Sequence, residues 1–278
     1  MNRKLSRTIQ NFGAYSGAVG ALVFFLFPVL YMVTAAFKTS TDFGRGSSAF
    51  FVFDVTLDHF ENLFTELGAG SATLNSLVIV AISTFSALIL GTLASFAFTH
   101  YSIRGKSALL LEILSIRMFP PIVSAIPFFL LSQELGIHDT HLILILVYTL
   151  IGLPLVVWVM NAFMGEVPRS VEEAALIDGC THLQVLYRIT LPLLLPGIAA
   201  TVMVVVLFAW NEYLFASLLT SSTAKTLPVI AAQALKPKAI AWGLASAAGV
   251  FMSLPVVALA LILQRYLVRG LTFGALKG

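Results

Sequence analysis

Six long apolar stretches, each separated from the next by polar residues, constrain the fold of this chain more than any other feature. A hydrocarbon core about 30 Å thick requires roughly 20 apolar residues per helical span. Of the 278 residues, 59% are hydrophobic and only 10% are charged, which excludes ordinary soluble domains and disordered chains. We therefore predict an all-α membrane protein with a single transmembrane domain over 1–278 and six transmembrane helices at 12–37, 72–99, 108–131, 141–164, 197–220 and 242–268.

The basic residues predict the orientation of these helices, because Lys and Arg are retained in cytoplasmic loops. Five of them lie in one set of alternate connecting segments: Lys38, Arg45, Lys225, Lys236 and Lys238. Ten lie in the other set: Arg3, Lys4, Arg7, Arg104, Lys106, Arg169, Arg188, Arg265, Arg269 and Lys277. Both termini are therefore expected in the cytoplasm. The first apolar stretch is longer than that of a cleaved signal peptide, so we interpret it as an uncleaved anchor.

The predicted cytoplasmic segment 165–196 is much longer than an ordinary connection between helices. Within it, Ser170 and Glu173 have the spacing of a capping box, which predicts a helix that starts at Ser170. Gly179 suits the left-handed residue that commonly follows a helix. The sequence thus predicts a first short helix that ends in a glycine turn.

A second short helix is expected after this turn. Thr181 and Gln184 repeat the capping spacing, and Leu191 with Pro192 is expected to end the helix. The hairpin is interpreted either as a surface element lying on the lipid headgroups or as a docking site for a protein. Acidic residues favour the protein, because cytoplasmic lipid is anionic. They are Glu166, Glu172, Glu173 and Asp178.

The same segment resembles the EAA loop of ATP-binding-cassette (ABC) importer permeases. Seven identities over 20 positions carry the resemblance: Glu173, Ala174, Ala175, Gly179, Ile189, Leu191 and Pro192. The C-terminal run 270–278 also resembles the tail of MalG-like permeases of carbohydrate importers. The resemblance covers essentially the whole chain. It implies the fold of an ABC type I importer permease, with 165–196 as the cytoplasmic coupling loop.

The resemblance also implies partners and a location. These are a second, MalF-like permease subunit, a dimer of ATP-binding-cassette ATPases, a periplasmic or lipid-anchored solute-binding protein, and a sugar or polyol substrate, with no nucleic acid. The seven matching residues would dock the ATPase, and Glu173 would offer a charge-assisted contact to a basic partner. The chain has no phosphate loop of its own, so we expect no cofactor on this subunit and ATP hydrolysis by the partner. The expected location is a bacterial or archaeal plasma membrane or inner membrane.

Ionisable residues within predicted spans are candidate pathway residues. The cluster Trp210, Asn211, Glu212 and Tyr213 combines aromatic rings with an amide and a carboxylate, which suits a polyhydroxylated solute. The alternative is that the cluster forms hydrogen bonds between helices. Arg117 precedes two prolines that are expected to break the third span, either as a flexible translocation helix or as a packing kink.

The last predicted external loop is a further candidate. By resemblance to the maltose system, 226–234 would reach into the external binding protein and help to empty it, and the alternative is a short interfacial connector. His138 and His141 lie near a span boundary with only Asp139 beside them, so no metal site is expected.

The sequence also bears on two other classes of membrane protein. An ion-coupled secondary transporter of a small polar solute would use charged residues such as Glu212 and Arg117, but usually carries an internal repeat that is not evident here. An intramembrane enzyme is disfavoured, because the chain lacks the H-E-x-x-H and G-x-S-x-G motifs. The preferred interpretation is therefore a permease subunit of an ATP-driven carbohydrate importer, which is not itself an enzyme.

Overall fold

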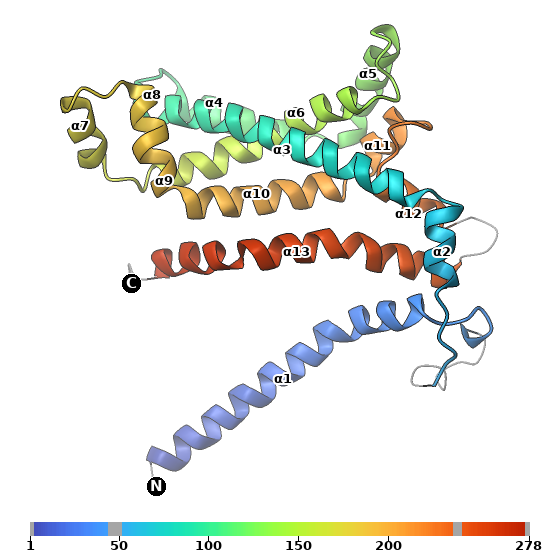
Figure 1. Cartoon of the computed structure of the whole chain (residues 1–278). Helices are drawn as coiled ribbons and strands as arrows, with labels where there is room; N and C mark the ends of the chain where they lie inside the picture. Colours follow the sequence, from blue (N-terminus) through green and yellow to red (C-terminus); the bar gives the residue numbers. More distant parts are fainter. Residues whose placement is uncertain (1–2, 44–51, 236–240, 276–278) are drawn as a thin grey trace. The chain divides into compact units, whose positions relative to one another are not determined.

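The computed structural model describes residues 3–43, 52–235 and 241–275, with side chains described over 14–43, 52–235 and 241–264. The secondary structure of these residues consists of helices and one isolated bridge between Lys38 and Val55 (Figure 1). The all-α prediction is confirmed. The chain divides into two compact units, one formed by Met1–Ala69 with Ala231–Ser253 and the other by Gly70–Ile230 with Leu254–Gly278.

The first unit contains α1 (Arg3–Ala36), α2 (Asp58–Thr65) and the first part of α13 (Trp242–Ala275). Aromatic packing joins α2 to α13, because the rings of Phe64 and Phe251 are 5.0 Å apart in an edge-to-face arrangement. Two glycines of α13 allow side chains of α2 and α1 to pack closely against this helix. A Cβ at Gly243 would clash with the imidazole of His59, and one at Gly249 would lie 2.9 Å from Sδ of Met32.

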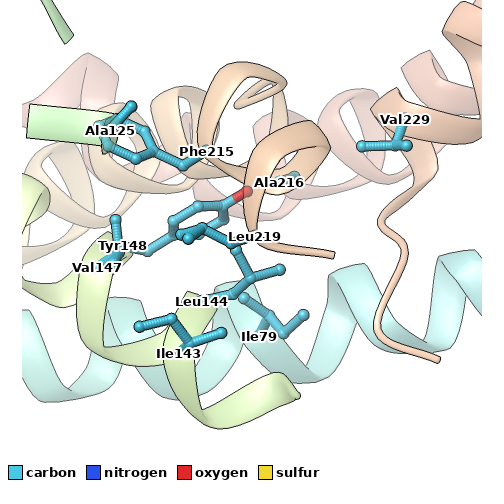
Figure 2. Packing of buried hydrophobic residues seen from close by; sticks show 10 residues of the cluster. All are labelled: Ile79, Ala125, Ile143, Leu144, Val147, Tyr148, Phe215, Ala216, Leu219 and Val229. Atoms are coloured by element: carbon cyan, nitrogen blue, oxygen red, sulfur yellow. The ribbon is translucent and has the colours of Figure 1, made fainter. Parts of the chain in front are cut away.

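The second unit is built on three long helices, α3 (Ala69–His100), α6 (His141–Met164) and α10 (Leu195–Trp210). Helices α3 and α6 approach closely at Gly91, where a Cβ would lie 2.5 Å from Cγ1 of Val156. Two buried clusters hold the unit together. One cluster lies around the first half of α6, where it meets α3 and shorter helices that precede and follow α6 in the sequence (Figure 2), and consists of Ile79, Ala125, Ile143, Leu144, Val147, Tyr148, Phe215, Ala216, Leu219 and Val229. The other lies toward the opposite end of α6 and consists of Ala87, Phe96, Val156, Met160, Met164, Leu186, Leu194 and Val205.

The third apolar stretch is broken where the two adjacent prolines stand. Helix α4 (Lys106–Ser115) continues as a 3₁₀ turn, Ile116–Met118, and α5 (Pro121–Glu134) then leaves at an angle of 84°. Proline lacks a backbone N–H and disfavours helical geometry in the preceding residue. The predicted break is confirmed.

The segment before α10 also bends. A helical path runs through α8 (His182–Val185), a π-helix (Leu186–Thr190) and α9 (Leu191–Leu193), and α10 follows at 79°. The expectation that Leu191 and Pro192 end this helix is wrong. Pro192 lies inside this continuous helical path, just after the π-helix, and the bend falls two residues later, at Leu194.

Among the described residues, four helical segments are long and apolar enough to cross a membrane: Ala14–Ala36, Ala69–His100, His141–Met164 and Trp242–Gln264. The two bent pairs raise this number to six if each pair is one span. The fifth predicted stretch is interrupted at 211–213, between α10 and α11 (Leu214–Leu219), and the segment that follows, which the sequence predicts to be external, includes α12 (Leu227–Gln233). The six spans and their bounds stay a prediction.

Candidate functional site

The hairpin between α6 and α10 begins with α7 (Arg169–Ile177). The helix starts directly after Pro168, and no side chain caps it. The prediction that Ser170 is the N-cap is therefore wrong. The reason is that Pro168 has φ −65° and ψ 119°, which directs the chain into the helix at Arg169 and leaves Ser170 inside the first turn.

The turn after α7 forms as the sequence predicts. Gly179 has φ +90°, a conformation that glycine adopts without steric cost. Thr181 and Gln184 then form a reciprocal capping box. The Thr181 side chain accepts from the Gln184 N–H at 3.3 Å, and the Thr181 N–H donates to the Gln184 side chain at 2.8 Å.

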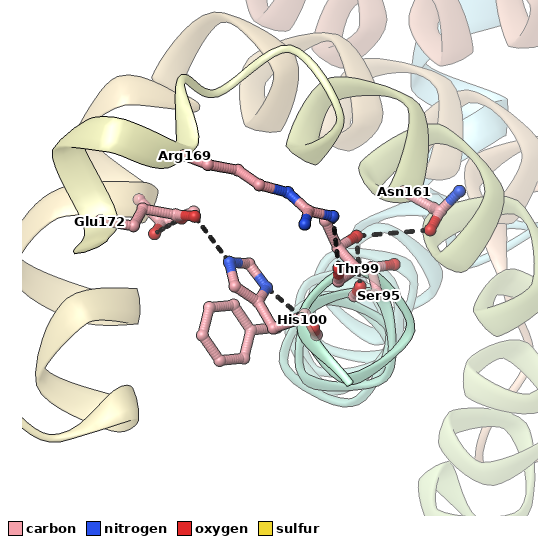
Figure 3. A network of polar contacts seen from close by, with 8 residues as sticks. Ser95, Thr99, His100, Asn161, Arg169 and Glu172 are labelled. Carbon is pink, nitrogen blue, oxygen red and sulfur yellow. Dashed lines mark hydrogen bonds and ion pairs between the residues drawn. The ribbon is translucent and has the colours of Figure 1, made fainter. Parts of the chain in front are cut away.

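Glu172 was interpreted from the sequence only as one of the acidic residues that favour a protein partner, but the structure buries it against its own chain. It is 5% exposed and points toward α3 (Figure 3). One carboxylate oxygen lies 2.7 Å from Nε2 of His100, the last residue of α3, and the other accepts from the Thr190 hydroxyl at 2.6 Å. His100 Nδ1 lies 3.0 Å from the Phe96 carbonyl oxygen, so both ring nitrogens face acceptors. This carboxylate joins α7 to a membrane-predicted helix and to the π-helix.

A second set of contacts supports the same junction. Arg169 donates from Nη2 to the Thr99 carbonyl oxygen at 3.4 Å (Figure 3). The Thr99 hydroxyl donates to the Ser95 carbonyl at 2.9 Å and lies 3.5 Å from Oδ1 of Asn161 on α6. Ser95 donates in turn to the Val157 carbonyl at 2.9 Å. The start of α7 is thus linked through α3 to α6.

The outward face of the hairpin is the face directed away from α3 and α6. Among the described residues, it forms no hydrogen bonds to these two helices. Of the seven predicted coupling residues, Ala175 is buried, Ile189 and Leu191 are partly buried, and four are exposed: Glu173, Ala174, Gly179 and Pro192. Three apolar side chains nearby are also exposed, with Ile177 at 86%, Leu183 at 63% and Tyr187 at 52%. Exposed apolar side chains beside polar residues are typical of a protein-binding surface.

The predicted pathway cluster lies at the junction of α10 and α11, but its members differ in surroundings. Trp210 is 2% exposed and packs inside the unit. Asn211, Glu212 and Tyr213 line a cavity of about 650 Å³. The Asn211 side chain is exposed, and its amide donates to the Leu207 carbonyl of α10, the helix that ends just before it, at 2.8 Å.

Glu212 is held by protein groups. Its carboxylate accepts from the Phe215 and Ala216 N–H groups at 2.9 and 3.1 Å, at the N-terminus of α11. It also accepts from the hydroxyl of Tyr148, a buried residue of α6, at 2.9 Å (Figure 2 shows the ring). A carboxylate at a helix N-terminus stabilises that end of the helix. Glu212 therefore positions α11 against α6.

Arg117 lies beside this network. A cavity of about 300 Å³ is lined by Arg117, Tyr148, Phe208 and Glu212, among others, and a second of about 330 Å³ also reaches Arg117. The Arg117 guanidinium lies 4.7 Å from the centre of the Phe208 ring, within the range of a cation–π interaction. Glu112 is the other ionisable residue of the third predicted span, and the described part of the chain shows no ion pair between it and Arg117.

The histidines near the span boundary have protein partners. His138 Nδ1 lies 3.3 Å from the Ser132 hydroxyl, and His141 Nε2 lies 2.8 Å from Oδ1 of Asn75. Within the described residues, no group of three or more potential metal ligands is close enough to hold an ion.

The helices, the bends and the hairpin define a multi-helix membrane transport component, and comparison with known proteins agrees. The family model described as binding-protein-dependent transport system inner membrane component matches residues 87–273. The chain therefore belongs to this family, as a permease subunit of an ABC transporter and not an enzyme. This membership excludes the alternative of an ion-coupled secondary transporter.

Individual relatives match over almost their full length. The "Probable ABC transporter permease protein y4oR" of Sinorhizobium fredii is 36% identical, covering 91% of each chain. The trehalose transport system permease protein SugB of Mycobacterium tuberculosis is 34% identical, covering 91% of this chain and 93% of the relative. A chain of a bacterial ABC transporter that imports the polysaccharide alginate superimposes with a TM-score of 0.73 at 20% identity, covering 96% of this chain and 99% of that one. The last comparison shows the fold alone.

Proposed function

We propose that this chain forms one half of the membrane channel of a carbohydrate importer, with a second permease subunit forming the other half. An ATPase dimer drives the transport, and a solute-binding protein delivers the sugar. The matched relatives support a carbohydrate, because SugB is a trehalose permease. The predicted orientation, with both termini in the cytoplasm, places the hairpin on the side where ATP is available.

The observation that carries the proposal is the difference between the two faces of α7. Its inward face is fixed to α3 and the π-helix through Glu172, whereas Glu173, Ala174 and Ile177 are exposed. The outward face is available to an ATPase subunit, and small alanine side chains allow close approach of its surface. A displacement of α7 by the ATPase would then be passed to α3 by short hydrogen bonds rather than lost in a flexible loop.

The solute pathway is proposed at the junction of α10 and α11. Asn211 and Tyr213 supply an exposed amide and an exposed aromatic ring, and Arg117 and Phe208 line the adjoining cavity. These groups suit the hydroxyl groups and C–H faces of a sugar. Trp210 and Glu212 support the wall, because Trp210 is buried and the carboxylate of Glu212 is bonded to α11 and Tyr148.

The test is affinity purification of the tagged chain from mild detergent, followed by mass spectrometry. We expect the wild type to retain an ATPase and a second permease, and Glu173→Lys to lose the ATPase alone, because charge reversal on the outward face opposes a basic partner. Glu134→Lys is the matched control. It makes the same charge change at an exposed site outside the hairpin, at the end of α5, and is expected to retain both partners. Retention of the ATPase by Glu173→Lys, with normal uptake, would contradict the docking role.

A further inference from the structure

His100, the last residue of α3, lies between two oxygen acceptors. Its Nε2 lies 2.7 Å from Oε2 of Glu172 on α7 (Figure 3). Its Nδ1 lies 3.0 Å from the carbonyl oxygen of Phe96, one turn earlier in α3. The His100 side chain is 17% exposed and Glu172 is buried, so water has little access to either contact.

These two contacts determine how many protons the histidine and the glutamate hold together. A neutral imidazole has one N–H and one lone pair, so it donates to only one of two acceptors. The other nitrogen would then direct its lone pair at an oxygen lone pair, at 2.7 or 3.0 Å. An imidazolium donates to both oxygens, and its bond to a carboxylate is charge-assisted. The geometry thus fits a His100 imidazolium paired with a Glu172 carboxylate.

The neighbouring groups favour this charged pair. The imidazole ring stacks on the Phe96 ring, with the centroids 3.9 Å apart and the planes inclined by 25°. An aromatic face attracts a cation that lies over it. The Thr190 hydroxyl, from the π-helix, donates to the other oxygen of Glu172 at 2.6 Å, and such a bond stabilises an ionised carboxylate. Both partners of the pair are therefore supported in their charged forms.

Few other charged groups surround His100. Arginine keeps its charge at all physiological pH values, whereas histidine is the residue type that changes charge between about pH 5 and 8. A variant must therefore separate His100 from the other histidine nearby, which is His182. The elements around this end of α3 contribute Glu172 and Arg169 from α7, the Asn161 amide from α6, the Thr190 hydroxyl from the π-helix, His182 from α8, whose ring faces Tyr101, and the exposed Arg104 from the connection to α4.

We propose that His100 is a positioning residue that holds α7 against α3 in its protonated form, so that the coupling of the hairpin to the membrane helices depends on pH. This inference rests on the proposed function, in which an ATPase drives α7. When the proton leaves, one of the two contacts becomes a contact between lone pairs, and the ring turns or α7 moves away. The attached state holds the extra proton, so rising pH loosens α7 and falling pH restores its attachment.

The test measures the sugar transported per ATP hydrolysed by the complete importer in proteoliposomes, with the pH varied on the side that contains ATP. We expect the wild type to transport about two- to fivefold less sugar per ATP at about pH 8.5 than at about pH 6.5, because a charge-assisted hydrogen bond is roughly twice as strong as a neutral one. His100→Arg keeps a charge at both pH values and should show no such fall. His100→Gln carries no charge and should give the low yield at both.

His182→Gln is the matched control. It removes an exposed histidine of α8 and leaves the contact between His100 and Glu172 in place. The ratio of its yields at the two pH values should equal that of the wild type. The proposal is overturned if the wild-type yield does not change with pH, or if His100→Arg shows the same fall as the wild type.

Nitrogen NMR of the importer with labelled histidine detects the proton directly and does not depend on transport. At about pH 6.5 both ring nitrogens of His100, assigned by their loss in His100→Gln, should carry a proton in the wild type, and one of them should lose it in Glu172→Gln. A neutral His100 ring in the wild type would overturn the proposal, also where His100→Arg fails to assemble. Absence of ATP-driven uptake at both pH values would contradict the proposed function instead, and the NMR result would still support or overturn the protonated pair.

Discussion

At the scale of single residues, the structure separates side chains that face a cavity from side chains that build its wall. Asn211 and Glu212 are neighbours in the sequence, yet among the described residues the Asn211 amide bonds to α10, the helix that it follows, while the Glu212 carboxylate joins α6 to α11. A polar side chain without bonds to other elements is free to bind a solute. A polar side chain that accepts three hydrogen bonds from the protein mainly supports the fold.

This difference predicts different effects for two substitutions. Glu212→Ala removes the acceptor of the buried Tyr148 hydroxyl, and leaving such a group unsatisfied costs about 1–3 kcal/mol. We expect a lower Tm of the purified complex, measured by intrinsic fluorescence. Asn211→Ala should keep the Tm and reduce uptake of radiolabelled sugar. An equal fall in Tm for both variants would favour a purely structural role for the whole cluster.

At the scale of elements, the hairpin is connected to the long helices by a buried apolar cluster that includes Leu186 and by a few short polar contacts. Helix α7 buries Glu172 and Ala175 on its inward face. The π-helix and α9 continue the path from α8 toward α10, so the hairpin is attached to α10 by helical backbone and to α3 by the Glu172 carboxylate. Both attachments are needed if a movement of α7 is to reach the membrane helices as a unit.

Removing the carboxylate should therefore loosen α7 while leaving the fold intact. Glu172→Ala leaves the buried Thr190 hydroxyl and the His100 ring without their partner, a cost of about 1–3 kcal/mol. We expect faster hydrogen exchange across Arg169–Ile177 and ATP hydrolysis with a reduced yield of transported sugar. Glu173→Ala, at the adjacent exposed position, should exchange as the wild type does. Unchanged exchange in Glu172→Ala would show that other contacts hold the helix.

At the scale of the whole molecule, the second unit carries the hairpin at one end of α6 and helices α5 and α11 at the other end. Helices α7 and α8 follow the end of α6 at Met164, whereas α5 and α11 lie at its beginning at His141 (Figure 1). A helix of this length is comparable to the thickness of a bilayer. The hairpin and the segment that follows α11 are thus expected on opposite sides of the membrane.

The single cysteine provides a test of this orientation. Cys180 lies directly after the glycine turn of the hairpin and is partly exposed. A membrane-impermeant maleimide should label it in inverted membrane vesicles and not in intact spheroplasts. The bound ATPase is expected to slow the labelling. Rapid labelling in spheroplasts would place the hairpin outside and reverse the predicted topology.

The sequence was informative where structure depends on local patterns. The apolar stretches, the break at Pro120 and Pro121, the positive φ of Gly179 and the capping box at Thr181 all follow from neighbouring residues. The predicted start of α7 was wrong because Pro168 directs the chain into the helix at Arg169, and the predicted end at Leu191 and Pro192 was wrong because the helical path continues to Leu193.

Local sequence patterns could not predict hydrogen bonds between residues that are far apart in the sequence. Glu172 bonds to a residue 72 positions away, and Asp139 bonds to a residue 82 positions away. The burial of Ala175, one helical turn after Glu172, shows the periodicity that could have placed this glutamate on the inward face. Asp139 offered no comparable signal, because its donors are mostly backbone N–H groups, which carry no sequence code.

The two faces of α7 also bear on which ATPase subunits this permease is expected to accept. Side chains that attach the helix to its own chain, such as Glu172 and Ala175, are different from those that face outward, such as Glu173 and Ala174. Substitutions of the outward residues are therefore expected to suit a different ATPase without disturbing the contacts that attach α7 to its own chain. A small set of substitutions on one helical face should suffice to let this permease share an ATPase with another importer in the same cell.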